Sequence, residues 1–261
     1  MRASLEFVRE YFESSQTRAN RALGQNFCIN GSALLSALNS VCLKPYNVLE
    51  IGAGLGALTE LLILRAKSVT AIELDSHLAG ELKSLNCKAI NADALKLDTS
   101  FIDEGWAVAG NLPYYITTPL IEKFLTTPAS AHLYMVQREA AQRFFSKPSE
   151  KNYCPITILS EIFFTPKLVL ELSPSDYYPQ PEVSSAIVAL TARSDAPAIN
   201  RKAFLSFVRR CLNMRRKTLK NNLGEVENAD ELLKRMNLAP KIRAEALSPL
   251  QFLELYQNLF Q

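Results

Sequence analysis

Residues 48–57 read Val-Leu-Glu-Ile-Gly-Ala-Gly-Leu-Gly-Ala, and this stretch decides the predicted fold. Val48–Ile51 is a short apolar run typical of a buried strand, and Leu58 to Arg65 has the pattern of a helix. The glycines between them, Gly52, Gly54 and Gly56, allow backbone to approach a ligand closely, and the helix start favours an anionic group. A strand, a glycine-rich turn and a helix in this order predict a parallel α/β domain with a ligand site at the turn.

Two further predicted strands end in acidic residues. Glu73 follows the strand 69–72 and lies about 20 residues after the glycine turn, where a carboxylate can accept both hydroxyls of a ribose. Asp93 follows the strand 88–91 and can bind the amino group of an adenine. Both have alternatives: Glu73 as an acid at a helix N-terminus, and Asp93 as the cap of the next turn.

A fourth strand, residues 106–109, leads into Gly-Asn-Leu-Pro-Tyr-Tyr at 110–115. Pro113 cannot donate to a sheet ladder, so the strand should end near Asn111. The Asn111 side-chain oxygen and a backbone carbonyl near Leu112 can accept hydrogen bonds from an exocyclic amine, and Tyr114 offers a ring on which a base can stack. The hexapeptide therefore predicts a site for the amino group of a nucleobase; the alternative is a proline turn with two core tyrosines.

These four strand ends fall on one edge of a parallel sheet and predict a single ligand site. Dinucleotide-dependent oxidoreductases and S-adenosylmethionine methyltransferases both use this architecture. Residues 111–114 favour methyl transfer, because hydride transfer does not need a site that binds an amine. Glu50, two residues before Gly52, also fits an adenosylmethionine site better. We therefore expect a Rossmann-like class I methyltransferase sheet over residues 1–193.

Two loops are candidates for the walls of this site. Residues 18–27 contain two arginines, a glycine and three amides before Phe27, and predict an ordered loop that closes over the site or an ordinary surface loop. Residues 174–181 are rich in proline, join predicted strands 167–172 and 186–190, and carry Tyr177 back toward the site or only brace the crossover. A further strand is expected at 132–136, followed by a helix.

A domain boundary is expected at 192–200, where polar residues and a proline interrupt the periodicity. The following residues, 194–261, have helical patterns and predict a small all-helical RNA-binding domain. Residues 201–220 contain eight basic residues and no acid: Arg201, Lys202, Arg209, Arg210, Arg215, Arg216, Lys217 and Lys220. A merely solvated helix face predicts mixed signs, so this segment favours contacts to RNA phosphates. The expected RNA-binding residues are Arg209, Arg210, Arg215, Arg216, Lys217 and Lys220.

Taken together, these segments resemble the small-subunit ribosomal RNA adenine dimethyltransferases over nearly the whole chain. The resemblance rests on Arg21–Phe27, Glu50–Gly56, Glu73, Asp93, Asn111–Tyr114, Gln137–Arg143, Pro174–Ser185, Arg215–Leu223 and Arg243–Leu247. It implies S-adenosylmethionine as cofactor, contacted at Asn26, Cys28, Gly52, Glu73, Asp93 and Asn111. It also implies stacking of the target adenine between Tyr114 and Tyr177, where family members usually carry phenylalanine at the second position. The implied substrate is two adjacent adenines in the terminal hairpin of small-subunit ribosomal RNA, each receiving two methyl groups.

The composition of the chain argues against a metal site, disulfide bonds, a membrane helix and a signal peptide. The chain has 261 residues, a net charge of +3 and five cysteines without a CxxC pair, so we expect neither a metal site nor a disulfide framework. The sequence has no run of about 18 apolar residues, so no membrane helix is expected. Charged residues interrupt the N-terminal segment, so no signal peptide is expected. We expect a cytoplasmic monomer whose partner is the small ribosomal subunit.

Three alternatives stay open at this level. One is a large-subunit ribosomal RNA methyltransferase of the antibiotic-resistance type, which shares the core motifs. Another is a DNA adenine methyltransferase, which the resemblance disfavours. The third is a ribosome-assembly or transcription factor that keeps the fold without catalysis, against which the presence of Glu73, Asp93 and Asn111 argues.

Overall fold

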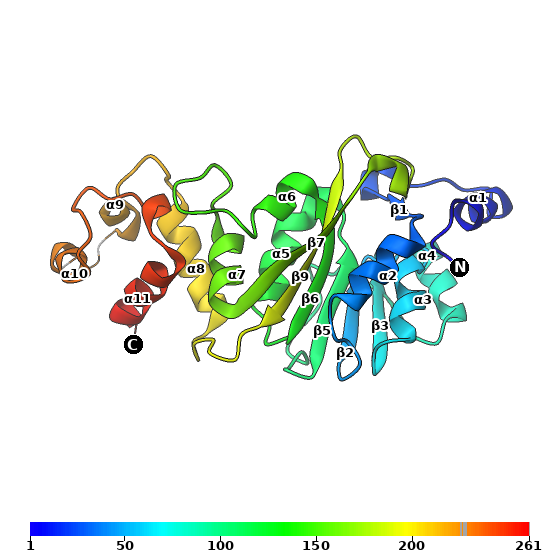
Figure 1. Ribbon diagram of the computed structural model, residues 1–261, viewed down its shortest axis with the longest axis horizontal. Helices are drawn as coiled ribbons and strands as arrows, with labels where there is room; N and C mark the ends of the chain where they lie inside the picture. The colour runs from blue at the N-terminus through cyan, green and yellow to red at the C-terminus, as the bar shows by residue number, and fades with distance from the viewer. Residues whose placement is uncertain (225, 227–228, 261) are drawn as a thin grey trace. The chain divides into compact units, whose positions relative to one another are not determined.

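The structure is a computed structural model that describes residues 1–224, 226 and 229–260 (Figure 1). The chain divides into two compact units: unit 1 holds residues 1–141 and 166–192, and unit 2 holds residues 142–165 and the chain from Arg193 onward. The segment 142–165 thus groups with the C-terminal helices, whereas the boundary predicted at 193/194 leaves this segment in the first domain. The predicted second domain, 194–261, also contains residues 225, 227, 228 and 261, which lie outside the described residues.

Unit 1 is built on a seven-stranded sheet in the order β4-β3-β2-β5-β6-β9-β7. The strands are β2 (Asn47–Ile51), β3 (Ser68–Glu73), β4 (Lys88–Asn91), β5 (Trp106–Asn111), β6 (Ala131–Gln137), β7 (Phe164–Leu172) and β9 (Ser185–Ala192). The five strands from β4 to β6 are parallel, and β9 runs antiparallel to β6. The carboxyl ends of β2, β3, β4 and β5 therefore meet at one edge, as the sequence predicts.

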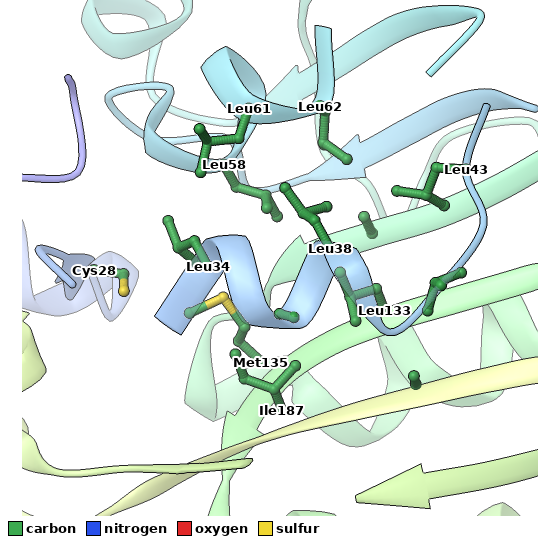
Figure 2. Packing of buried hydrophobic residues seen from close by; sticks show 14 of the residues in the cluster. Cys28, Leu34, Leu38, Leu43, Leu58, Leu61, Leu62, Leu133, Met135 and Ile187 are labelled. Carbon is green, nitrogen blue, oxygen red and sulfur yellow. The ribbon is translucent and has the colours of Figure 1, made fainter. Parts of the chain in front are cut away.

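Helices cover the sheet and are connected to it by short turns. Unit 1 contains α1 (Leu5–Ser14), α2 (Gly31–Asn39), α3 (Ala57–Ile63), α4 (Ser76–Glu81), α5 (Thr117–Leu125) and α6 (Arg138–Gln142). All residues of β6 except the last are buried, so both faces of the sheet are covered there. Figure 2 shows Leu34 and Leu38 of α2 between leucines of α3 and the side chains of Leu133, Met135 and Ile187.

A second, two-stranded sheet joins the two loops that were expected beside the site. β1 (Phe27–Cys28) pairs antiparallel with β8 (Tyr177–Tyr178), in the register Phe27 with Tyr178 and Cys28 with Tyr177. Beyond the pair, the Ile29 N–H donates to the Asp176 carbonyl at 2.8 Å. The Asn30 side chain donates to Asp176 Oδ1, also at 2.8 Å. Segments almost 150 positions apart in the sequence are thereby fixed to each other.

Unit 2 is helical. Its helices are α7 (Pro155–Phe163), α8 (Arg201–Leu212), α9 (Leu219–Leu223), α10 (Ala229–Arg235) and α11 (Pro249–Phe260). The basic segment 201–220 is not one helix, because α8 ends at Leu212 and the Asn222 side chain bonds both the N–H and the carbonyl of Met214, at 3.0 and 3.2 Å. Phe204 anchors α8 through edge contacts to the rings of Phe163 and Tyr256. Among the helices that the structure describes, none combines the length and hydrophobicity needed to cross a bilayer.

Candidate active site

The edge formed by the carboxyl ends of β2 to β5 borders an open pocket within unit 1. Most of the predicted cofactor and catalytic residues line it: Asn26, Cys28, Glu50, Gly52, Gly54, Glu73, Asp93, Asn111, Leu112, Pro113 and Tyr114. Two predicted residues, Gly56 and Tyr177, do not line it.

The glycine turn brings backbone to the pocket wall at Gly54. Its φ of 57° lies in the left-handed region, where a side chain is strained. Gly56 serves the packing of the turn instead, because it precedes α3 and a Cβ there would lie 2.8 Å from Leu85 Cδ1. Gly56 therefore permits close contact of the turn with leucines, which explains why it does not border the pocket.

Glu73 connects the end of β3 to this turn. Its Oε2 accepts the Gly54 N–H at 2.8 Å and its Oε1 accepts the Asp75 N–H at 2.9 Å. Burial raises the pKa of Glu73, and these two backbone hydrogen bonds oppose the rise. Because a carboxylate has about four acceptor positions, both oxygens can still accept further donors from the pocket.

Glu50 lines the pocket and is only 1% exposed. Among the described residues its Oε2 has no hydrogen-bond partner. Burial, and secondarily the nearby charge of Glu73, raises the pKa of Glu50 to about 8, while Thr59 opposes the rise. A buried carboxyl without a full set of partners favours a positively charged or hydrogen-bond-donating ligand beside it.

Asp93 follows β4 at the edge of the pocket. It lines the pocket, and its Oδ1 also accepts the Leu95 N–H at 2.9 Å, which caps the turn after β4. Its other oxygen lies 3.9 Å from Lys96 Nζ. Contact of Asp93 with an adenine amino group stays a prediction. Within the described ranges, no group of three or more histidine, cysteine or acidic side chains is placed to hold a metal ion.

Asn111 ends β5, and its amide orientation is fixed from the loop at 18–27. The Asn111 Nδ2 donates to the Asn26 carbonyl at 2.8 Å, so the acceptor atom of the side chain is Oδ1. The following residues are held firmly, because the Leu112 N–H donates to the Met135 carbonyl and the Pro113 carbonyl accepts the Thr117 hydroxyl at 2.9 Å. The structure therefore places a fixed amide at the pocket, followed by a rigid proline turn.

The loop at 18–27 forms one wall of the pocket. Gln25 Nε2 donates to Asp75 Oδ2 at 3.1 Å, and a Cβ on Gly24 would lie 3.2 Å from the ring of Tyr115. Gln25 and Tyr115 both line the pocket, although neither is among the site residues predicted from the sequence. Cys28 lines it too, and burial raises the pKa of its thiol to about 11, so the thiol stays protonated at neutral pH.

The three tyrosines near the site differ in exposure. Tyr114 is half-buried, and its hydroxyl lies 2.7 Å from the Ser185 hydroxyl. Tyr177 is 1% exposed and belongs to the core cluster, and its backbone pairs with that of Cys28 in the small sheet. Tyr115 also lines the pocket and is 55% exposed. In this structure, therefore, Tyr114 and Tyr115 border the pocket and Tyr177 lies behind it.

All six predicted RNA-binding residues lie in unit 2 and are exposed, and we call them the basic surface: Arg209, Arg210, Arg215, Arg216, Lys217 and Lys220. Ion pairs engage Arg215 and Lys220. Arg215 Nε lies 2.9 Å from Glu245 Oε2, and Lys220 Nζ lies 2.5 Å from Asp230 Oδ2. Their charges are therefore partly neutralised, which the sequence did not reveal because the acids lie 30 and 10 positions away.

In comparisons with known proteins, one family model matches this chain, and the similar proteins carry names that agree with that family. A family model described as "Ribosomal RNA adenine dimethylase" matches residues 16–261. A protein of Lactobacillus acidophilus named "Ribosomal RNA small subunit methyltransferase A" is 36% identical, covering 97% of this chain and 94% of its own length. A protein of the same name from Chlamydia abortus is also 36% identical, with 99% and 98% covered.

Solved structures agree on the fold. A dimethyladenosine transferase from Plasmodium falciparum matches with a TM-score of 0.71 at 26% identity, covering 88% of this chain and 95% of that one. The 23S rRNA methyltransferase ErmE matches with a TM-score of 0.66 at 24% identity, covering 90% of this chain and 100% of that one. At this identity the match supports the fold alone. The predicted methyltransferase fold with a C-terminal helical region is confirmed.

Proposed function

This chain belongs to the ribosomal RNA adenine dimethylase family, an enzyme family that uses S-adenosylmethionine as methyl donor, and we propose that it dimethylates N6 of two adjacent adenines in the terminal hairpin of small-subunit ribosomal RNA. The observation that supports this most directly is the Asn111 amide. Its Nδ2 is engaged by the Asn26 carbonyl, which leaves Oδ1 as an acceptor for an adenine amine at the pocket.

The pocket residues fit the proposed cofactor. When bound, S-adenosylmethionine supplies a methyl group on a cationic sulfonium. The Glu73 carboxylate keeps acceptor capacity for two ribose hydroxyls, and Asp93 offers a carboxylate for an adenine amino group. Glu50, whose Oε2 is buried without a hydrogen-bond partner among the described residues, supplies a carboxyl that a cationic ligand stabilises in its charged form.

Asn111 carries the chemical role in this proposal. The lone pair of an adenine amine is delocalised into the ring, so the nitrogen is a poor nucleophile. If Asn111 Oδ1 and the carbonyl of Leu112 accept its two hydrogens, the nitrogen becomes more pyramidal and its lone pair is directed at the methyl group. Positioning and electrostatics then supply most of the rate, with no covalent enzyme intermediate and no strong general base.

Binding of the target base is assigned to aromatic rings. The adenine must leave its stack to reach Asn111, and the ring of Tyr114 offers a face for it. Tyr177 becomes a second face only if the β1–β8 segment moves, because its ring is buried in the present arrangement.

The alternatives carry less support. The curated relatives at 36% identity are named as small-subunit methyltransferases over nearly their whole length, whereas the 23S enzyme at 24% identity supports only the fold. A non-catalytic factor has no need for a fixed amide and two buried carboxylates around a pocket. We further propose that the protein acts as a cytoplasmic monomer and reaches the small ribosomal subunit through the basic surface.

The decisive experiment incubates the protein with radiolabelled S-adenosylmethionine and small subunits that lack adenine dimethylation. We expect label on two adjacent adenines, and mapping by primer extension locates them. Large subunits and duplex DNA serve as parallel substrates. Label confined to either of these substrates, or an absence of label with properly folded protein, would contradict the proposal.

A further inference from the structure

Arg215 is exposed on the basic surface, but three of its donors are engaged inside unit 2. Nε donates to Glu245 Oε2 at 2.9 Å, Nη1 to the Lys151 carbonyl at 3.0 Å, and Nη2 to the Glu150 carbonyl at 3.3 Å. A guanidinium presents its five N–H groups in a rigid planar fork. With three of them directed at protein oxygens, the group is oriented by the protein and has little freedom to follow a phosphate.

Glu245 also contacts the loop 146–152 through its backbone. The Ser149 N–H donates to the backbone carbonyl of Glu245 at 2.7 Å, and Ser149 has a φ of 69°, in the left-handed region. Within the loop, the Lys147 N–H donates to Glu150 Oε2 at 2.9 Å. A non-glycine residue keeps a positive φ only where its surroundings fix it. Arg215 and Glu245 together supply that constraint.

The loop held in this way presents groups that suit RNA. Lys147 and Lys151 are exposed, and Phe145, directly before the loop, is 40% exposed. Exposed basic side chains close in sequence to an exposed aromatic ring favour phosphate contacts and stacking of an unpaired base. Arg216 and Lys217 follow Arg215 in the chain, so the loop and the basic surface meet at Arg215.

We infer that residues 145–151 form a second RNA-binding element, in which Lys147 and Lys151 contact phosphates and Phe145 stacks on an unpaired base. Arg215 is its positioning residue: it holds the loop in place, and Arg216 and Lys217 contact the RNA instead. The inference rests on the proposed function, because it takes small-subunit RNA as the partner of unit 2.

Glu245→Ala distinguishes this role of Arg215 from a direct phosphate contact, because the two roles predict opposite signs. If Arg215 bound phosphate, removal of its acidic partner would free its charge, tighten binding to small subunits and steepen the salt dependence. If Arg215 positions the loop, Glu245→Ala weakens binding several-fold and speeds hydrogen exchange at residues 149–153. Arg215→Ala should have the same effect, and the double variant should be no worse than either single one.

The loop lysines are tested by Lys147→Ala with Lys151→Ala, measured by binding to undermethylated small subunits across a salt series. Each lost phosphate contact should reduce the slope of log affinity against log salt by about 0.7–0.9. Lys44→Ala with Lys67→Ala, which removes the same charge from exposed positions of unit 1, is the control. Equal slopes in the two double variants, or tighter binding of Glu245→Ala, would overturn the inference. If instead the unmodified protein failed to methylate small subunits, the proposed function itself would fail.

Discussion

The pocket of unit 1 and the basic surface of unit 2 hold their charged groups in different ways. Glu50 and Glu73 in the pocket are nearly buried, and Glu73 is fixed by backbone N–H groups of its own strand end and of the glycine turn. On the basic surface the cations are exposed, and Arg215 and Lys220 are paired with acids from other segments. Pocket residues are therefore set by motif and topology, whereas the role of a surface cation depends on its tertiary neighbours.

If the chemistry resides in the pocket, Asn111→Ala should have the largest effect. Loss of the fixed acceptor should lower methyl transfer on the order of 10²–10³-fold, by analogy with the removal of a single oriented group from other polar active sites. The assay is single-turnover methylation of small subunits at saturating cofactor. The control is Asn91→Ala, which removes an exposed amide that donates to the carbonyls of Glu73 and Leu74 at the neighbouring strand end. A near-normal rate, or an equal loss in both variants, would refute the amine-binding role.

Glu73→Ala should affect the cofactor before the RNA. Each hydrogen bond to a charged group contributes about 1.5–3 kcal/mol, so we expect S-adenosylmethionine affinity to fall roughly 10- to 100-fold. Isothermal titration calorimetry measures this loss, and Glu73→Gln, which keeps one acceptor oxygen, should lose less. Unchanged affinity in both variants would remove Glu73 from the cofactor site.

Arg216→Ala with Lys217→Ala should reverse this pattern, with weaker subunit binding and intact cofactor affinity. Two lost phosphate contacts should reduce the effect of raising salt from about 50 to 200 mM by roughly ten-fold. Lys220→Ala, whose charge is paired with Asp230, should change the salt dependence less. Identical salt slopes in all three proteins would show that these cations only solvate the surface.

The buried Glu50 carboxyl should make the unfolding equilibrium constant depend on pH, by about ten-fold per pH unit. Burial raises its folded-state pKa to about 8, above the value near 4.5 of an unperturbed glutamate, so the folded state keeps a proton that the unfolded state loses. This contribution to stability is fully present below about pH 4.5 and is lost as the pH rises toward 8, by about 1.4 kcal/mol per unit. Denaturant unfolding of Glu50→Gln without cofactor should show a flatter profile from pH 5 to 8. Parallel profiles would contradict the buried, protonated state.

The smallest effect is expected for Tyr177→Phe. The Tyr177 hydroxyl is buried and makes no hydrogen bond of good geometry among the described residues, although the Ser185 hydroxyl, which bonds with Tyr114, lies close enough to oppose the rise that burial causes in the Tyr177 pKa. Removing an unsatisfied hydroxyl should raise the free energy of unfolding by about 1 kcal/mol. Thermal or denaturant unfolding tests this, and destabilisation would mean that the hydroxyl has a partner after all.

Much of unit 1 could be predicted because its signals are local. The strand ends at Gly52, Glu73, Asp93 and Asn111 follow directly from apolar runs and their terminating residues, and the parallel topology then brings them to one edge. The positions of Gly56 and Tyr177 could not be predicted in the same way. Gly56 packs against Leu82 and Leu85, which follow α4, and Tyr177 belongs to the core cluster and pairs with Cys28. None of these neighbours is adjacent in sequence.

The basic surface shows more clearly what the sequence alone does not predict. An acid-free run of eight cations predicts a positive surface, but it does not predict that α8 ends at Leu212 or that Glu245 binds Arg215. Both depend on long-range contacts: Asn222 bonds the backbone of Met214, and the loop 146–152 returns from the region before α7. Charge composition therefore identified the surface, and only tertiary structure assigns individual roles within it.

The pairing of β1 with β8 has a consequence for synthesis of the protein. Asn26, which orients the Asn111 amide, is anchored through Phe27 and Cys28 to residues 177–178, translated about 150 codons later. A nascent chain that already contains β2 to β6 still lacks the partner strand of its pocket wall. Closing so long a loop is slow relative to forming local contacts. The order of translation thus delays assembly of the complete pocket until Tyr177 and Tyr178 have left the exit tunnel.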